Sequence, residues 1–323
     1  MSGAAPPAVR GSRVGHNADV SDPRLPVLPA QDDDVARLVH DLGIPGLADV
    51  HVHFLPERVL AKVRAYFDEA HRHYGREWPL VYRGDEEERL RRLEAMRVRR
   101  FTSLVYAHKP GMSSWLNDWS LDFAARTPGC VPTATFYPED GVGGYVGSAL
   151  ERGARVMKLH VQVGDYDPRD PRLDPAWGAC QEAGTVLVVH CASGPRPGRF
   201  TGVGPIGDVL RRFPRLRLVV AHLGMPEYVD FLALAEEHQG VALDTTMAGT
   251  DYVQQVAPFP GGLRGRVRSL AREGKVVLGT DFPNIPYAYA HQLAVLPRLG
   301  IDDVDLLAAV LWRNGNALLG PEE

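Results

Sequence analysis

Short apolar runs rich in β-branched residues recur along the chain and alternate with segments of helical periodicity. The runs are nearly continuous in hydrophobicity, which is typical of strands buried on both faces of a parallel sheet. They lie at about 47–54, 100–107, 130–137, 155–161, 185–191, 216–222, 240–246 and 275–281. Such strand–helix units predict a (β/α)8 barrel, a fold of about 250 residues, and leave an open doubly wound sheet as the alternative.

The chain before the first run has a different character. The first 30 residues or so are rich in Pro, Gly, Ala and Ser, so residues 1–45 are predicted to be a largely disordered N-terminal leader with a short helix at Asp32–Leu42. Residues 46–323 are predicted to form a single catalytic domain, in which the segment 55–84 is an insertion on the active-site side. Helices are predicted between the runs, at Asp85–Met96, Ser113–Arg126, Tyr145–Arg152, Asp174–Ala183, Pro205–Phe213, Glu227–His238, Leu263–Glu273, Tyr287–Leu299 and Asp302–Asn316.

Composition narrows the class of protein. The 323 residues include 36 basic and 40 acidic side chains, a formal net charge of −4, which argues against a nucleic-acid partner. Three scattered cysteines indicate a reducing compartment, and no apolar run approaches the roughly 20 residues that a membrane helix requires. We therefore expect a cytoplasmic protein with a small-molecule substrate, no membrane or nucleic-acid partner, and a homodimer as an open question.

Polar residues end several of the predicted strands. Side chains two residues apart on a strand share a face, so the imidazoles of Asp49-Val-His-Val-His-Phe54 point together. Because the active sites of such barrels lie at the C-terminal ends of the strands, these groups are expected to meet at one mouth. They are His51 and His53, Lys158 and His160, His190, His222, and Asp281. A single histidine at a strand end is more often an ordinary hydrogen-bonded residue, but burying so many titratable groups together is costly unless they pair or bind a metal.

Imidazole nitrogens and a carboxylate oxygen are ligands that zinc accepts, and a catalytic zinc site keeps one position for water. His51, His53, His190 and Asp281 are therefore predicted to hold one divalent metal ion, most simply Zn²⁺. Asp281 is also predicted to accept the proton of the water, and His222 to polarise the substrate or move a proton.

These motifs, taken together, resemble the amidohydrolase superfamily, specifically its amidohydrolase-2 branch of metal-dependent hydrolases and decarboxylases. The similarity spans roughly 46–319. It is carried by Asp49–Phe54, the strand Val156–His160, Val189-His-Cys191, Ala221-His-Leu-Gly224 and Gly279-Thr-Asp-Phe-Pro283. The resemblance implies one metal, often zinc, on His51, His53, His190 and Asp281, with His222 acting on the substrate.

Lys158 leaves a second arrangement open. Some members of the superfamily carboxylate a lysine on this strand to bridge two metals, which here would add His190 and His222 to the second ion. The alternative is a lysine paired with Asp244 or Asp281. His160 lies two residues from Lys158 on the same strand, so it faces the same side and is a further candidate for the site. We favour the single metal, because the other motifs resemble the mononuclear branch.

The reaction and the substrate are less determined. Hydrolysis of an amide, lactone or ester is the predicted activity, and non-oxidative decarboxylation of an aromatic or unsaturated acid is the alternative. A barrel that keeps its ligands without catalysis is the third reading. Arg196 and Arg199 are candidates to clamp a substrate carboxylate, and Asn284 is a further substrate-binding candidate.

Overall fold

A ring of short parallel strands forms the centre of the computed structural model, which describes Met1 and residues 25–321. The predicted disorder of the leader falls mainly on residues outside this part. The strands are β1 (Leu47–Asp49), β2 (Val98–Thr102), β3 (Cys130–Val131), β4 (Thr133–Thr135), β5 (Val156–His160), β6 (Val186–His190), β7 (Arg217–Val220), β8 (Val241–Asp244) and β9 (Val276–Val277). Every pairing between neighbouring strands is parallel, as the nearly continuous apolar runs predicted.

The strands form two sheets, β1-β2-β3 and β4 to β9, that are joined at both edges. At one edge, Pro132 separates β3 from β4 because proline has no N–H to donate, so the predicted third strand is present as two pieces. At the other edge, Val52 pairs with Phe282, and the N–H of Asp281 donates to His51. The predicted (β/α)8 barrel is therefore confirmed, with its first and last strands side by side.

The strands are shorter than the apolar runs predicted. The eighth run, placed at 275–281, contains only two residues of regular strand, and the first, placed at 47–54, contains three. The remaining residues of both runs join the two edges by irregular backbone contacts, in which Val50 donates to Leu278 and Asp281 donates to His51. Asp281 itself adopts φ 68°, which a ladder cannot accommodate. These irregular ends are the parts of the strands that carry polar side chains.

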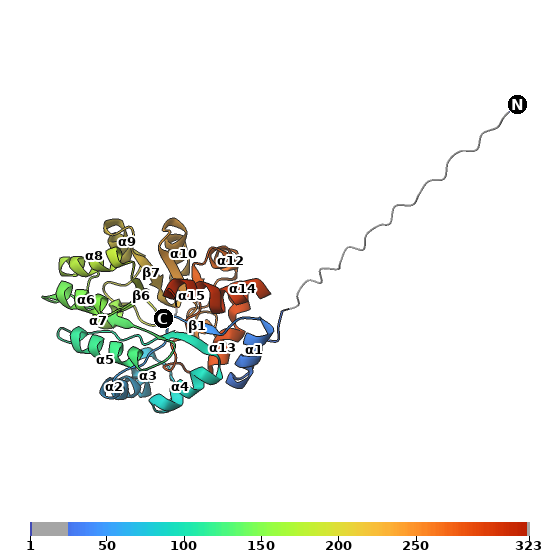
Figure 1. Cartoon of the computed structure of the whole chain (residues 1–323), viewed down its shortest axis with the longest axis horizontal. Helices are drawn as coiled ribbons and strands as arrows, with labels where there is room; N and C mark the ends of the chain where they lie inside the picture. Colours follow the sequence, from blue (N-terminus) through green and yellow to red (C-terminus); the bar gives the residue numbers. More distant parts are fainter. Residues whose placement is uncertain (2–24, 322–323) are drawn as a thin grey trace.

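Helices surround the strands in chain order (Figure 1). Two predictions match closely: Asp174–Ala183 is α8 residue for residue, and α4 begins after Asp85, whose side chain caps it by accepting the N–H of Glu88. The helices are α1 (Val35–Asp41), α2 (Glu57–Asp68), α3 (Ala70–Tyr74), α4 (Glu86–Ala95), α5 (Ser113–Ala125), α6 (Val142–Glu151), α7 (Val161–Gly164), α8 (Asp174–Ala183), α9 (Val203–Arg212), α10 (Tyr228–Glu237), α11 (Asp251–Gln254), α12 (Arg264–Arg272), α13 (Tyr289–Ala294), α14 (Val304–Ala308) and α15 (Asn314–Leu319).

Two of the predicted helices are broken in the structure. The segment predicted at Tyr287–Leu299 becomes α13 followed by a 3₁₀ turn at Leu296–Leu299, where Pro297 cannot donate a helical hydrogen bond. The segment predicted at Asp302–Asn316 becomes α14, a wider π-helical turn and α15. None of the helices in residues 25–321 combines the length and apolarity that crossing a bilayer requires.

Alternate side chains along the strands build two separate apolar layers. Those pointing outward pack against the helices, as Met157, Leu159 and Leu187 do. Those pointing inward fill the barrel below its mouth with a separate layer of small, mostly β-branched residues. That valine layer consists of Val50, Leu104, Val131, Val156, Val186, Val188, Val219, Ala242, Val277 and Leu319 of α15. Polar residues of the same inward parity follow it toward the C-terminal ends of the strands.

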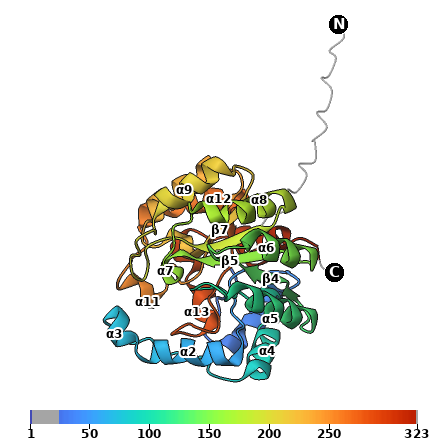
Figure 2. The same ribbon diagram turned by 90° about the vertical axis from the view of Figure 1, so that its left-hand side faces the viewer.

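The segment between β1 and α4 lies over this end of the barrel. It forms α2 and α3, two helices that the periodicity of the sequence did not predict. Figure 2 shows α3 and α11 on the side of the molecule opposite the C-terminus. Tyr252 of α11 donates its hydroxyl to the carbonyl of Glu77, and its ring packs against Trp78. These contacts hold the inserted segment across the mouth.

Candidate metal centre

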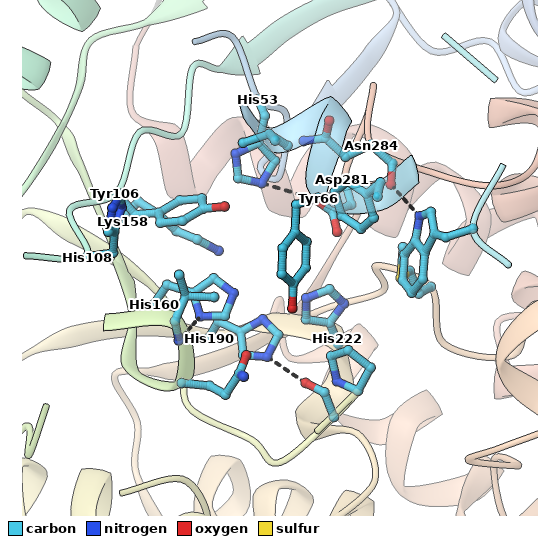
Figure 3. Close-up of a pocket in the computed structure, with 18 of the residues that line it drawn as sticks. His53, Tyr66, Tyr106, His108, Lys158, His160, His190, His222, Asp281 and Asn284 are labelled. Atoms are coloured by element: carbon cyan, nitrogen blue, oxygen red, sulfur yellow. Dashed lines mark hydrogen bonds and ion pairs between the residues drawn. The ribbon is translucent and has the colours of Figure 1, made fainter. Parts of the chain in front are cut away.

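The ends of the strands enclose a cavity of about 1140 Å³ whose innermost wall carries the predicted polar residues. Figure 3 shows several of their side chains converging on it. The lining includes His51, His53, Lys158, His160, His190, His222, Asp281 and Asn284. Seven of these eight are the strand-end residues that the period-two pattern singled out; the eighth is Asn284.

His51 and His53 point to the same side of the first strand, with ring centroids 5.3 Å apart. Each donates its Nδ1–H away from the cavity: His51 to the carboxylate of Asp244, at 2.8 Å, and His53 to the carbonyl of Leu104, at 2.7 Å. A neutral imidazole that donates from Nδ1 keeps the lone pair of Nε2 for a ligand. Both histidines therefore present Nε2 to the cavity.

Asp281 faces these two nitrogens. Its Oδ1 lies 3.0 Å from Nε2 of His53 and 3.8 Å from Nε2 of His51. Burial alone would raise the pKa of Asp281, but its pairing with His53 and the nearby His51 and His222 hold that pKa below its usual value. A carboxylate oxygen and an imidazole lone pair that face each other at 3.0 Å need a cation between them, either a proton or a metal ion. The donor set thus fits a divalent metal.

His222 also comes within ligand distance of this group. One ligand atom each from His51, His222 and Asp281 lie within 4.8 Å of one another. The backbone of His222 has φ 60°, a strained conformation that its N–H stabilises by donating to Asp244 at 2.9 Å. Its Nδ1 is buried and has no hydrogen-bond partner among the described residues. An imidazole held this way is available either to a metal or to a substrate.

His190 is held differently. Its Nε2 donates to the carbonyl of Gly194 at 2.7 Å, so only Nδ1 carries a lone pair in the neutral ring. The ring stacks on His160 at a centroid distance of 4.0 Å and meets His222 edge-on at 4.7 Å. His190 therefore lies beside the His51–His222–Asp281 group, and its predicted place in the ligand set stays a prediction.

Burial makes four imidazoles of the cluster harder to protonate. Burial, followed by the neighbouring cationic groups, lowers the pKa of His51, His160 and His190 well below the ordinary value, and lowers that of His222 to about 4. Only the neutral ring binds a metal, because a proton occupies the same lone pair. Burial therefore favours the form of these four rings that can bind a metal ion.

Lys158 reaches the same point from β5. Its fully buried Nζ lies 3.1 Å from Nε2 of His51, and burial lowers its pKa to about 8, although Asp244 and Asp281 act in the opposite direction. Among the described residues, no ion pair joins Lys158 to either carboxylate, so the alternative of a lysine paired with Asp244 or Asp281 is not the arrangement found. Lys158 instead donates to a predicted metal ligand.

Of the three residues predicted to bind substrate, only Asn284 lines the cavity. The N–H of Asn284 donates to the carbonyl of Asp281. Arg196 and Arg199 do not line it, although Pro195 and Pro197 of the same loop do. Arg199 instead lies over the ring of Phe200. The structure thus does not bring either guanidinium to the cavity wall.

The roles of two further groups in the site, Asp244 and Tyr106, were not predicted from the sequence. Asp244 ends β8 and organises the site by accepting from His51 and from the N–H of His222, yet its sequence signal is a single carboxylate after an apolar run. Tyr106 lines the cavity between His53 and His160, with ring centroids at 5.9 and 5.1 Å. Its place just beyond β2 was the available sequence signal.

One known protein family matches most of this chain. The sequence model of the amidohydrolase family matches residues 48–320, most of the chain. The chain belongs to the amidohydrolase family. The resemblance seen in the sequence is thereby confirmed, and this amidohydrolase is a metal-dependent enzyme of a superfamily that uses divalent metals. No curated protein sequence matches it.

Solved structures show the same fold at low identity. An uncharacterised TIM-barrel protein from Bordetella bronchiseptica is 18% identical, with a TM-score of 0.65 over 84% of this chain and 98% of that one. A 5-carboxyvanillate decarboxylase from Novosphingobium aromaticivorans, complexed with manganese, is 13% identical, with a TM-score of 0.52 over 85% and 96%. A dihydroorotase from Saccharomyces cerevisiae is 14% identical, with a TM-score of 0.53 over 86% and 85%.

Proposed function

We propose that this amidohydrolase hydrolyses an amide, lactone or ester bond of a small molecule with water activated on one divalent metal ion. Asp281 carries the proposal, because it is ionised and faces the Nε2 atoms of both His51 and His53. A metal ion bound there would lower the pKa of water from about 15.7 toward about 7. We infer that the ion is zinc, since the donors are imidazole nitrogens and one carboxylate.

In this proposal the residues divide the work. His51, His53, His190 and Asp281 would hold the metal, and Asp281 would also be placed to accept the proton of the attacking water. The neutral His222 donates a hydrogen bond to the substrate oxygen or carries a proton to the leaving group. Asp244 keeps His51 in the tautomer that presents Nε2, because it accepts the Nδ1–H.

Decarboxylation is the second candidate, favoured by the similarity to the manganese-bound decarboxylase. The same ligands would then orient a substrate carboxylate, and His222 would deliver the proton that replaces it. Incubating the metal-loaded enzyme with lactones, amides and aromatic acids, followed by mass spectrometry, separates the two reactions. Gain of water supports the hydrolase, loss of carbon dioxide supports the lyase, and inertness toward the whole panel contradicts both.

A pair of variants tests the ligand assignment. His190→Gln should lose bound metal, whereas His222→Gln should keep the metal and lose turnover. Metal content is measured by plasma mass spectrometry alongside activity. The reverse pattern would transfer the ligand role to His222, which already lies within reach of His51 and Asp281.

The number of metal ions is tested separately. One equivalent of zinc supports the mononuclear site that we propose. Two equivalents, together with an acid-labile mass of carbon dioxide on the intact protein, would show that Lys158 is carboxylated and bridges two ions.

A further inference from the structure

The cavity carries an excess of positive charge in a chain whose net charge is negative. Its cationic lining side chains are Arg58, Lys62, Arg76, Lys109 and Lys158, and among the described residues its only carboxylate is Asp281. The sequence contains four lysines in all, and only Lys275 lies away from this cavity. The positive charge of the cavity lining is therefore opposite in sign to the net charge of the chain.

Three of these cations have no evident structural use. Arg58 and Lys62 on α2, and Lys109 in the loop after β2, form what we call the cationic rim, and all three residues are exposed. Among the described residues none of them makes a side-chain hydrogen bond or ion pair. Arg76, by contrast, donates to the carbonyl of Tyr252 and stacks on its ring.

The two segments that carry the rim pack together, because Leu60 of α2 and Met112 beyond β2 belong to one apolar cluster. Burial, and then Lys109 and Lys62, lower the pKa of His108, although 47 positions separate these lysines in the sequence. The neighbouring carboxylate of Glu139 is used by the N–H of Gly111 rather than by Lys109. The rim thus gathers positive charge from two segments without a carboxylate partner.

Helix α2 is less stable for carrying its part of the rim. Arg58 and Lys62 are one turn apart on the helix, and like charges at this spacing are mutually repulsive. Arg58 also lies in the first turn, where the helix dipole disfavours a cation. Both side chains nevertheless lie on the cavity side of α2, together with Val59, Val63 and Tyr66. A bound anion would relieve both costs.

We propose that the cationic rim binds an anionic group, a carboxylate or a phosphate ester, at the far end of the substrate. The substrate is then bipartite: its reacting bond lies at the metal centre, an apolar middle lies along Val59, Val63 and Trp115, and its anion lies at the rim. The cavity, about 1140 Å³, is large enough for such a molecule. That the anion belongs to the substrate rests on the function proposed above, whereas the anion site itself does not.

Binding of substrate-like probes tests the rim without requiring turnover. Isothermal titration calorimetry of the metal-loaded enzyme compares phenylhexanoate, phenylhexyl phosphate and the neutral phenylhexanamide at low salt. The variant Arg58→Gln/Lys62→Gln is compared with Arg37→Gln/Arg91→Gln, which removes the same charge from exposed sites outside the cavity.

We expect the rim variant to bind the anionic probes about tenfold more weakly, the sum of two modest ion pairs, and the amide unchanged. The control variant should bind all three probes as the wild type does. A larger loss for the phosphate than for the carboxylate would identify a phosphate ester as the natural anion, and the opposite ranking a carboxylate. Equal affinity of the wild type for phenylhexanoate and phenylhexanamide, or an equal loss in both variants, would overturn the proposal.

The two proposals fail in different ways. In Asp281→Asn, turnover should be lost while the preference for anionic over neutral probes remains, because the rim does not depend on the metal. An enzyme that binds the anions through the rim but turns over no substrate would contradict only the proposed reaction.

Discussion

The innermost wall of the cavity, which carries the buried histidines and Asp281 and which we call the floor, differs from the cationic rim in how its polar side chains are held. On the floor, the buried imidazoles of His51 and His53 each donate to a fixed partner, so their geometry is set by the fold. On the rim, Arg58, Lys62 and Lys109 are exposed and have no such partner among the described residues. Buried polar groups must be satisfied to be tolerated, whereas exposed ones need not be. The side chains of the floor are therefore fixed in position by the fold, whereas those of the rim are free to pair with an anionic ligand.

The largest expected effect concerns the floor. Asp281→Asn removes the carboxylate that faces both histidines, and we expect turnover to fall by more than about a hundredfold, beyond the usual cost of losing an outer partner. Activity and metal content are measured together, with Asp230→Asn on the surface of α10 as the control. Turnover at wild-type levels in Asp281→Asn would remove this residue from the mechanism.

Asp244, which accepts hydrogen bonds from His51 and His222, should have a smaller effect when it is changed. Asp244→Asn weakens the acceptor of His51 Nδ1 and of the His222 N–H, so we expect metal affinity to fall by about 10- to 100-fold. Competition with a chelator of known affinity measures the change. An unaltered affinity would mean that the tautomer of His51 does not depend on Asp244.

Salt should separate the two regions. Raising the ionic strength from about 0.05 M to about 0.5 M shortens the screening length to a few ångströms, and exposed pairs weaken while buried ones change little. Binding of phenylhexanoate should then fall about fivefold, and metal occupancy should not change. If salt removes the metal as readily as the anion, the floor is not protected from solvent as its burial indicates.

The smallest effect is on stability and has the opposite sign. Arg58→Gln should stabilise the protein by about 0.3 kcal/mol, because it removes the repulsion with Lys62. Arg91→Gln, which breaks the Arg91–Glu87 pair at the same spacing on α4, should destabilise it by a similar amount. Chemical denaturation of both variants measures the difference. A loss of stability in Arg58→Gln would mean that the rim also serves the fold.

The floor could be predicted from the sequence because strands repeat every two residues and the barrel gathers their ends. His51, His53, Lys158, His160, His190, His222 and Asp281 all reached the cavity for this reason. Which nitrogen of each ring faces inward could not be predicted, since the partners Leu104 and Gly194 contribute only backbone carbonyls.

The rim was out of reach for a different reason. The segment 55–84 was expected on the active-site side, but local periodicity did not show that it forms α2 or that Arg58 and Lys62 face the cavity. The same limit applies to Arg196 and Arg199, whose loop reaches the cavity through its prolines instead. Charge in an arginine-rich chain has meaning only once its tertiary position is known.

The valine layer beneath the floor determines how substrate and product can reach and leave the cavity. Val156, Val188 and Leu319 belong to the layer that fills the barrel interior, so the barrel has no open channel along its axis. Substrate, product and water therefore cannot pass through the barrel, and they enter and leave on the side where the cationic rim lies. If the rim binds the anion as proposed, a product that keeps its anionic group must leave the rim before the next substrate binds, so the same side chains would control both substrate binding and product release.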